Sequence, residues 1–281
     1  MSLSLLTNVT SLNAQRNLAK TQTALASSIS KLSSGMRINL AADDAAGLGI
    51  SENLKADIRS LAQAQRNAND GISLTQVAEG AMDEMTGIVT RMRELGVQSA
   101  NQTLGSTERS YIQTEFNQLR AEINRISAVT EYNGQKLIDG SASAGLSFQI
   151  GMHNSANDRL SMSVTRLTTS TLGSTSLHVA SATLSTVTGA RNALGVFDQA
   201  ITQLSTARSK LGAVQNRMQV TISNLSVAHE NLSAANSRIR DVDVASETSA
   251  LTRSQVLSQA GLAVLSQANQ LPSSALSLLR G

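Results

Sequence analysis

The sequence predicts a mainly α-helical protein, built as an antiparallel long-helix bundle or coiled-coil rod with a small β-hairpin region. Three observations predict this fold class: a long heptad line of apolar residues, a near absence of proline, and a scarcity of aromatic residues. The 281 residues include one Pro, no Trp, two Tyr and three Phe. Because aromatic side chains supply much of the buried area in compact cores, this composition argues against a thick globular core.

The longest heptad line lies in the C-terminal third of the chain, where every seventh residue is apolar. An α-helix turns every ~3.6 residues, so a seven-residue repeat places these side chains on one narrow stripe. The stripe is about 60 Å long at ~1.5 Å per residue, which is too extended for an ordinary globular core. The predicted outer-domain seam consists of Phe197, Leu204, Leu211, Met218, Leu225, Leu232 and Ile239. The companion line is half polar, which suits a helix packed among partner helices: Leu194, Ile201, Arg208, Gln215, Ile222, His229 and Asn236.

Both ends of the chain lack acidic residues, since the first is Asp43 and the last is Glu247. This shared composition predicts that 1–42 and 243–281 form one coiled-coil unit, although two ordinary amphipathic helices would explain each end equally well locally. Residues 1–38 are expected to be helical, and Pro272 is expected to end or kink the last helix. The predicted seam of this unit consists of Leu18, Leu25, Ile29, Leu32, Leu257, Val264, Ala268, Leu271 and Leu278.

Residues 43–242 are expected to form a second, long-helix unit. A stretch without proline over 44–100 predicts a long helix, and a shorter helix is expected from Ser106, which is a plausible N-cap. Apolar and polar residues alternate on both sides of Asn154–Asp158, which predicts a β-hairpin within about 133–165.

The segment 165–190 is rich in Ser and Thr, has no firm period and carries no charge between Arg166 and Arg191. It is therefore expected to be loop and exposed surface. The long helix that carries the heptad line begins at about 191, and a last helix follows. The two chain ends are therefore expected to meet at one end of an antiparallel rod, with the hairpin at the other end.

No residue pattern predicts an enzyme or a metal site. The three histidines, His153, His178 and His229, are too scattered to share a metal ion, and the absence of Cys excludes disulfides and thiolate ligands. The adjacent carboxylates of Asp43 and Asp44 are explained by placement at a helix N-terminus. The glycines form no phosphate-binding loop after a strand. We therefore expect no catalytic residues and no cofactor.

Nucleic-acid binding and membrane insertion are also not expected. The formal net charge is +3, without a dense Lys/Arg stripe or an aromatic stacking platform. No stretch approaches the ~18 continuous apolar residues of a transmembrane helix. The segment after Met1 has no basic region followed by a long apolar core, so no ordinary signal peptide is expected, and export would need another route.

Specific strings resemble the two terminal regions of bacterial flagellins. The N-terminal strings are LSSGMRIN (32–39), AADDAAGL (41–48), RNANDGIS (66–73) and AEGA (78–81). The C-terminal strings are SRIRDVD (237–243), QAG (259–261), QANQLP (267–272) and the final LSLLRG (276–281). The resemblance covers roughly 1–165 and 190–281, and only 165–190 stands where many flagellins insert large outer domains.

The resemblance implies a structural subunit of the flagellar filament that self-assembles into a helical tube for swimming motility. It implies that 1–42 and 243–281 form the inner coiled-coil domain, and that the protein is exported unfolded by the flagellar type III apparatus to the cell exterior. It also implies an export chaperone for the C-terminal segment, a filament cap and hook-junction proteins as partners. Because narrow, polar-rich helices are marginal in water, we expect both ends to be disordered in the monomer.

A second implication concerns Arg91, Leu95 and Glu115, which match family positions contacted by the vertebrate Toll-like receptor for flagellin. The primary role expected for these residues is contact between neighbouring subunits of the filament, with receptor binding as a by-product. Two other functions remain open from the sequence: a hook–filament junction protein, and a secreted adhesin or immune-modulating binding module that does not polymerise.

Overall fold

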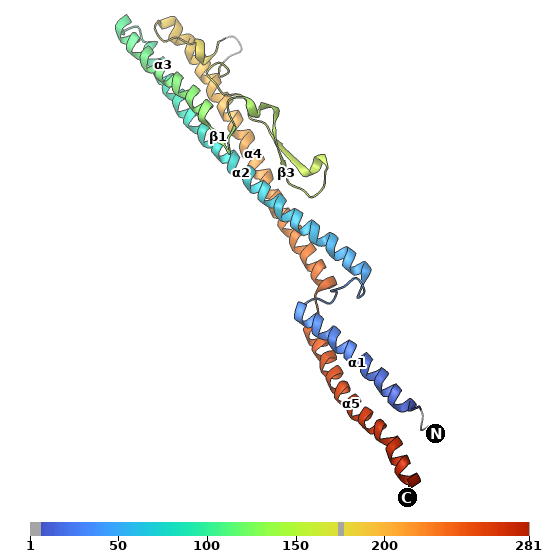
Figure 1. The fold of residues 1–281 in the computed structure, drawn as a ribbon. Helices are drawn as coiled ribbons and strands as arrows, with labels where there is room; N and C mark the ends of the chain where they lie inside the picture. Colours follow the sequence, from blue (N-terminus) through green and yellow to red (C-terminus); the bar gives the residue numbers. More distant parts are fainter. Residues whose placement is uncertain (1–6, 174–176, 281) are drawn as a thin grey trace. The chain divides into compact units, whose positions relative to one another are not determined.

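The computed structural model describes residues 7–173 and 177–280, with backbone alone for 271–280 (Figure 1). Its mainly helical fold confirms the predicted fold class. The α-helices of the described residues are α1 (Val9–Ser34), α2 (Ala45–Ser99), α3 (Ser106–Val129), α4 (Val187–Arg240) and α5 (Val244–Arg280). The strands are β1 (Glu131–Tyr132), β2 (Gln135–Lys136), β3 (Leu146–Gln149) and β4 (Arg159–Met162). Short 3-10 turns are η1 (Ser141–Ala144), η2 (Ala156–Asp158) and η3 (Val179–Ser181).

The chain divides into two compact units, one formed by Met1–Ile58 with Glu230–Gly281 and the other by Arg59–His229. The expected boundaries at 42/43 and 242/243 differ from this division. Residues 43–58 and 230–242 lie with the chain ends because their side chains bond one another: Ser51 Oγ donates to Asn236 Oδ1 over 2.8 Å.

The core of Arg59–His229 is built where α2, α3 and α4 meet. Phe197, Leu204, Leu211 and Met218 of α4 are fully buried, and Leu225 is nearly so. Leu232 and Ile239, at the end of the same predicted line, belong to the other unit and are half-buried. The rings of Phe116 and Phe197 pack with centroids 5.8 Å apart. Each buried Leu or Phe side chain stabilises the fold by about 1.5–3 kcal/mol.

The face of α2 that packs in this core follows two interleaved heptad lines of small and flexible residues. The first is Leu61, Ala68, Thr75, Met82 and Val89, and the second is Ala64, Gly71, Ala78, Met85 and Met92. Gly71 has no side chain, so Met218 of α4 and Phe148 of β3 approach the α2 backbone closely. The small residues of α2 thus receive the large side chains of α4.

Two hairpins follow α3. In the first, β1 and β2 pair antiparallel with Tyr132 opposite Gln135, and Asn133 and Gly134 both have positive φ. This Asn-Gly pair forms the tight turn that matches strand twist. In the second, β3 and β4 pair from Leu146 opposite Met162 to Gln149 opposite Arg159. Ile150 and Leu160 of this hairpin pack on Ala68 and Met218.

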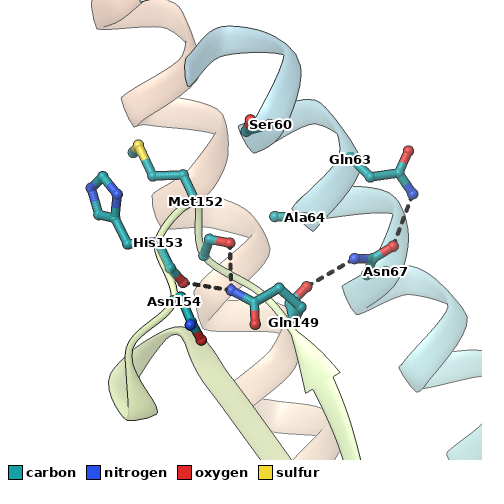
Figure 2. Close-up of a pocket in the computed structure, with 9 residues that line it drawn as sticks. Ser60, Gln63, Ala64, Asn67, Gln149, Met152, His153 and Asn154 are labelled. Atoms are coloured by element: carbon teal, nitrogen blue, oxygen red, sulfur yellow. Dashed lines mark hydrogen bonds between the residues drawn. The ribbon is translucent and has the colours of Figure 1, made fainter. Parts of the chain in front are cut away.

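Side-chain amides tie the loop of the second hairpin to α2. Gln63 Nε2 donates to Asn67 Oδ1, Asn67 Nδ2 donates to the Gln149 carbonyl, and Gln149 Nε2 donates to the carbonyls of Gly151 and His153 (Figure 2). These bonds are 2.8–2.9 Å long and border a hollow of about 370 Å³. Because these amide donors bond within the hollow, we interpret it as a structural joint between α2 and the hairpin.

The expectation that 165–190 forms exposed surface was wrong. The segment is mostly non-helical, as predicted, but Leu167, Leu172, Val179 and Leu184 are buried in the core. Residues 174–176 lie outside the described residues. The burial of these four residues could not be predicted from the sequence, because their spacing follows neither a helical nor a strand period.

Side chains of α3 and α4 hold this segment in place through its backbone. Asn124 Oδ1 accepts from the Thr169 N–H, and Gln113 Oε1 accepts from the Leu184 N–H. The amide of Gln203 both accepts from and donates to the backbone of Gly173. A backbone without regular structure can be buried only when its polar groups are paired in this way.

Two glycines of α2 are predicted to respond oppositely to substitution. Gly87→Ala should raise the free energy of unfolding by up to about 1 kcal/mol, because the added Cβ meets no atom within 4 Å. Gly71→Leu should lower it by about 1–3 kcal/mol, because a Cβ there already lies 2.6 Å from Met218 Cε and 3.3 Å from Phe148 Cδ1. Urea unfolding of the monomer measures both, and a shift of the same sign in the two variants would contradict this packing.

Candidate functional site

The two chain ends pair as helices α1 and α5, which lie side by side (Figure 1). The less exposed positions of each helix recur at steps of three and four, which is the coiled-coil pattern. On α1 they are Ser11, Ala14, Leu18, Thr21, Leu25, Ser28 and Leu32. On α5 they are Leu251, Ser254, Ser258, Gly261, Leu265 and Ala268. The seam therefore alternates Leu with small or polar residues.

Close approach and polar bonds join the pair more than apolar burial does. A Cβ added to Gly261 would lie 3.3 Å from Leu18 Cδ1, so Leu18 packs almost on the α5 backbone. Ser11 Oγ donates to Asn269 Oδ1 over 2.8 Å. Among the described side chains of the two helices, the buried ones are Ser11, Ser28 and Ala268. The pair thus buries little apolar area by itself.

Part of the predicted inner seam faces away from this pair. Leu18, Leu25 and Leu32 lie toward α5, but Ile29 is 52% exposed, so its assignment to the seam was wrong. Leu257 and Val264 are likewise 52% and 57% exposed, because the α5 seam is the small-residue line through Gly261 and Ala268. Leu271 and Leu278 lie outside the described side chains. From the sequence, the heptad line with the larger residues was predicted to be the α5 seam. The close approach of α5 to α1 instead requires the line with the smaller residues.

Pro272 does not end α5, contrary to one of the two expected outcomes. A proline has no N–H, so the carbonyl four residues earlier, that of Ala268, loses its helical donor. Asn8 Nδ2 donates to this carbonyl over 2.8 Å, and Asn8 Oδ1 accepts from the Ser11 N–H at the start of α1. One side chain therefore caps α1 and replaces the hydrogen bond that Pro272 removes.

One exposed face of α5 carries apolar residues among polar ones. It consists of Val244, Ala245, Thr248, Ser249, Thr252, Arg253, Val256 and Leu257. The large apolar members Val244, Val256 and Leu257 are all exposed, and Leu262 and Val264 continue the exposed apolar surface toward the C-terminus. Contiguous exposed apolar surface of this kind marks a site of protein–protein contact.

Backbone bonds join the turn after α1 to the turn after α4. The Arg37 N–H donates to the Arg240 carbonyl over 2.6 Å, and the Val242 N–H donates to the Gly35 carbonyl over 3.1 Å. The Arg37 guanidinium also donates to the Ile239 carbonyl over 2.7 Å, which places a cation at the α4 C-terminus. These bonds fix the turn after α1 against the turn after α4.

Three carboxylates complete this joint. Arg240 Nη1 lies 2.5 Å from Glu52 Oε1, and its side chain is the least exposed of the ion-paired arginines described. The backbone N–H groups of Leu40 and Asn39 donate to the Asp43 carboxylate and hold its pKa below the usual range. Asp43 thus orders the turn before α2, while Asp44 Oδ1 accepts from the Gly47 N–H at the start of α2. The adjacent carboxylates of Asp43 and Asp44 thus have a structural role.

The candidate receptor residues are only partly where the resemblance implied. Arg91 and Glu115 are about half-exposed and paired, with Arg91 Nη2 lying 2.9 Å from Glu115 Oε1. Arg91 also pairs with Glu94 over 3.0 Å, and both carboxylates raise its pKa, through hydrogen bonds first and charge second. Leu95 is 1% exposed in the core, so its assignment as an exposed contact residue was wrong.

The described residues contain no group of three His, Asp or Glu side chains placed to hold a metal ion. None of the described helices is both long and apolar enough to cross a bilayer.

Comparison with known proteins identifies the family. The model of the bacterial flagellin N-terminal helical region matches residues 5–143, and that of the C-terminal helical region matches 194–279. A flagellin of Halalkalibacterium halodurans is 45% identical over 275 residues, covering 97% of this chain and 98% of that protein. The chain belongs to the bacterial flagellin family.

A second relative agrees with this family, and one solved structure shares the fold. The flagellar filament 33 kDa core protein of Treponema phagedenis is 42% identical over 97% of this chain and 98% of its own length. The structure of a putative flagellar hook-associated protein from Vibrio parahaemolyticus superposes with a TM-score of 0.60 at 15% identity, covering 71% of this chain and all of that one. The second likeness shows the fold alone. As a flagellin, the chain is a structural subunit of the extracellular bacterial flagellar filament.

Proposed function

We propose that this flagellin polymerises into a helical tube through the paired chain ends, with the exposed face of α5 from Val244 to Leu257 as a principal subunit contact. The observation that carries the proposal is the exposure of Val244, Val256 and Leu257 along one helix face of a pair that buries almost no large side chain. A single chain leaves this apolar area in water, and packing against further copies removes it. No catalytic role is proposed.

The same features support the proposal that 1–42 and 243–281 become ordered on assembly. The α1–α5 seam consists of isolated leucines among Ser, Thr, Gly and Ala. Burial of this kind offsets little of the conformational entropy lost by two helices. Neighbouring copies would supply the missing apolar contacts.

We predict that amide exchange in the monomer is fast throughout α1 and α5 and slow in the core of α2 and α4. In sedimented filaments, the amides of α1 and α5 should become protected, because assembly buries their exposed faces. Hydrogen exchange read by mass spectrometry on both states measures this. Strong protection of both chain ends in the monomer would contradict the proposed ordering.

A charge placed on this exposed face of α5 should block assembly. With seeds of fragmented filaments, wild-type monomer should elongate into tubes, and Leu257→Glu should elongate at least ~10-fold more slowly. Burying an unpaired carboxylate costs several kcal/mol, and each 1.4 kcal/mol is a factor of ten. Pelleting and negative-stain electron microscopy measure elongation.

The matched control is Leu257→Met, which keeps an apolar side chain of similar volume and should elongate as wild type does. Because Leu257 is exposed in the single chain, neither variant should change the urea midpoint of the monomer. Deletion of 1–42 or of 243–281 should abolish elongation. Wild-type monomer that stays soluble with competent seeds would overturn the proposed polymer and favour a junction protein or a non-polymerising binder.

The proposal extends to the partners needed for export and assembly. We propose unfolded export through the flagellar type III apparatus, with a chaperone on 243–281 and with cap and hook-junction proteins at the growing filament. The exposed apolar face of α5 supports the chaperone, since this surface needs cover before polymerisation. Hook–filament junction and adhesin functions are not favoured, because a flagellin and a flagellar filament core protein each match 97% of this chain over 98% of their own length.

Recognition by the vertebrate Toll-like receptor for flagellin is proposed for Arg91 and Glu115 alone. Their half-exposed ion pair joins α2 and α3 and presents a cation and a carboxylate together. Buried Leu95 supports the helix packing beneath this pair.

In a reporter-cell assay, Arg91→Ala monomer should need about tenfold more protein for the same response, because truncating an interface arginine commonly costs more than 1 kcal/mol. Arg125→Ala is the control, since Arg125 pairs within α3 with Glu122 over 2.6 Å at similar exposure. An unchanged response to Arg91→Ala would remove Arg91 from the contact, and no response to wild type would remove the receptor.

A further inference from the structure

An exposed hollow lies between α2 and the first hairpin, outside the assembly surface proposed above. Its volume is about 550 Å³, and it is lined by Asp70, Leu74, Tyr132, Asn133 and Gln135. Asp70 is an exposed residue of α2, whereas the other three polar residues belong to the β1–β2 hairpin and its turn. Polar side chains from two elements therefore gather around one carboxylate.

The polar side chains of this hollow have no partner among the described residues. The Asp70 carboxylate forms no ion pair, and the phenol of Tyr132 and the amides of Asn133 and Gln135 form no hydrogen bond in that part of the chain. The hollow in Figure 2 differs, because its amide donors bond within it. A carboxylate, a phenol oxygen and two amide oxygens can all accept from an ammonium group. We call these four polar residues the acidic hollow.

A second hollow on the same unit carries the opposite charge. It lies between α4 and the segment that follows β4, and its volume is about 310 Å³. Its lining includes Arg166 and Lys210, together with hydroxyl and amide side chains and no carboxylate. Both cations are exposed, and neither forms an ion pair with a residue that the structure describes. This second hollow is therefore cationic.

Lys210 is the better placed of the two cations to bind a carboxylate of another molecule. Arg166 already acts on its own chain: hydrogen bonds from Ser141 lower the pKa of Asp139 most, and the charges of Lys136 and Arg166 add smaller effects. Lys210 extends from α4 on a flexible four-carbon stem that ends in a compact charge. Its ammonium group can thus reach into a hollow on a second surface.

The two hollows are distinct surfaces of the long-helix unit. No residue lines both of them, and no ion pair between described residues joins them. A polymer that grows without limit needs a contact between two different surfaces of its subunit, because a contact between identical surfaces closes into a dimer. An acidic hollow and a cationic hollow on different elements of one chain meet this requirement.

We propose that the acidic hollow of one copy receives Lys210 of a neighbouring copy, which gives the polymer a contact between long-helix units in addition to that of the chain ends. This inference rests on the proposed polymerisation, but the residues that carry it belong to Arg59–His229. Opposite charges steer the two copies together and determine which surfaces meet, because like charges at a contact are strongly unfavourable.

Seeded elongation of the full-length chain tests this contact by reversing each charge. Asp70→Lys and Lys210→Glu should each elongate at least ~10-fold more slowly than wild type at the same salt concentration, because each places like charges together. The double variant exchanges the two charges and should recover most of the wild-type rate. Because both residues are exposed in the single chain, the urea midpoint of each monomer should stay at the wild-type value.

A mixture of the two single variants separates a contact between copies from one within a chain. In an equimolar mixture, alternating copies bring each introduced lysine beside an introduced glutamate, and each remaining Asp70 beside a remaining Lys210. The mixture should therefore elongate faster than either variant alone at the same total concentration. Slow elongation of both the double variant and the mixture would overturn this pairing.

Glu84→Lys is the matched control, because Glu84 is another exposed carboxylate of α2 without an ion pair in the described structure. Glu84 lies outside the acidic hollow, so this variant should elongate as wild type does. An equal loss of rate in Glu84→Lys, or a wild-type rate in Asp70→Lys, would overturn this contact alone. Wild-type monomer that does not elongate on competent seeds would overturn the polymer and this contact with it.

Discussion

The packing of α4 against α2 is the interaction on which the rest of the structure depends. Large side chains of α4, from Phe197 to Met218, pack on a face of α2 that carries Ala and Gly between Ala64 and Ala78 and mainly Met between Met82 and Met92. Neither helix could remain ordered alone over this length, because isolated helices are marginal in water. Once the pair exists, α3 adds Phe116 beside Phe197, and the β3–β4 hairpin closes over Ala68 and Met218.

Helices α1 and α5 also pair with heptad spacing, but small and polar residues take a larger share of their seam. Their seam is closed by Ser11, Gly261 and Ala268, whereas the larger residues Leu257 and Val264 face solvent. The helices approach closely but exclude little apolar surface from water. In the proposed assembly, other copies of the chain would cover the exposed face of α5 and add to the stability of this pair.

Several backbone groups that have no partner in their own element are paired by side chains from distant parts of the chain. Asn8 supplies the donor that Pro272 lacks, and Arg37 occupies the last carbonyls of α4. Asn124, Gln113 and Gln203 pair the backbone of 165–190, which allows a segment without regular structure to enter the core. Each of these bonds joins residues far apart in the chain, and none has a local sequence signal.

The sequence by itself determined the helical class, the position of the hairpin and the family. Heptad spacing and period-two alternation are local patterns, and each is read along a single element. Only the tertiary structure decided which face of α5 meets α1, and that Leu95 and the leucines of 165–190 are buried. The physical reason is that a period identifies the stripes of a helix, whereas the partner that approaches each stripe is set by side-chain size and by polar bonds across the fold.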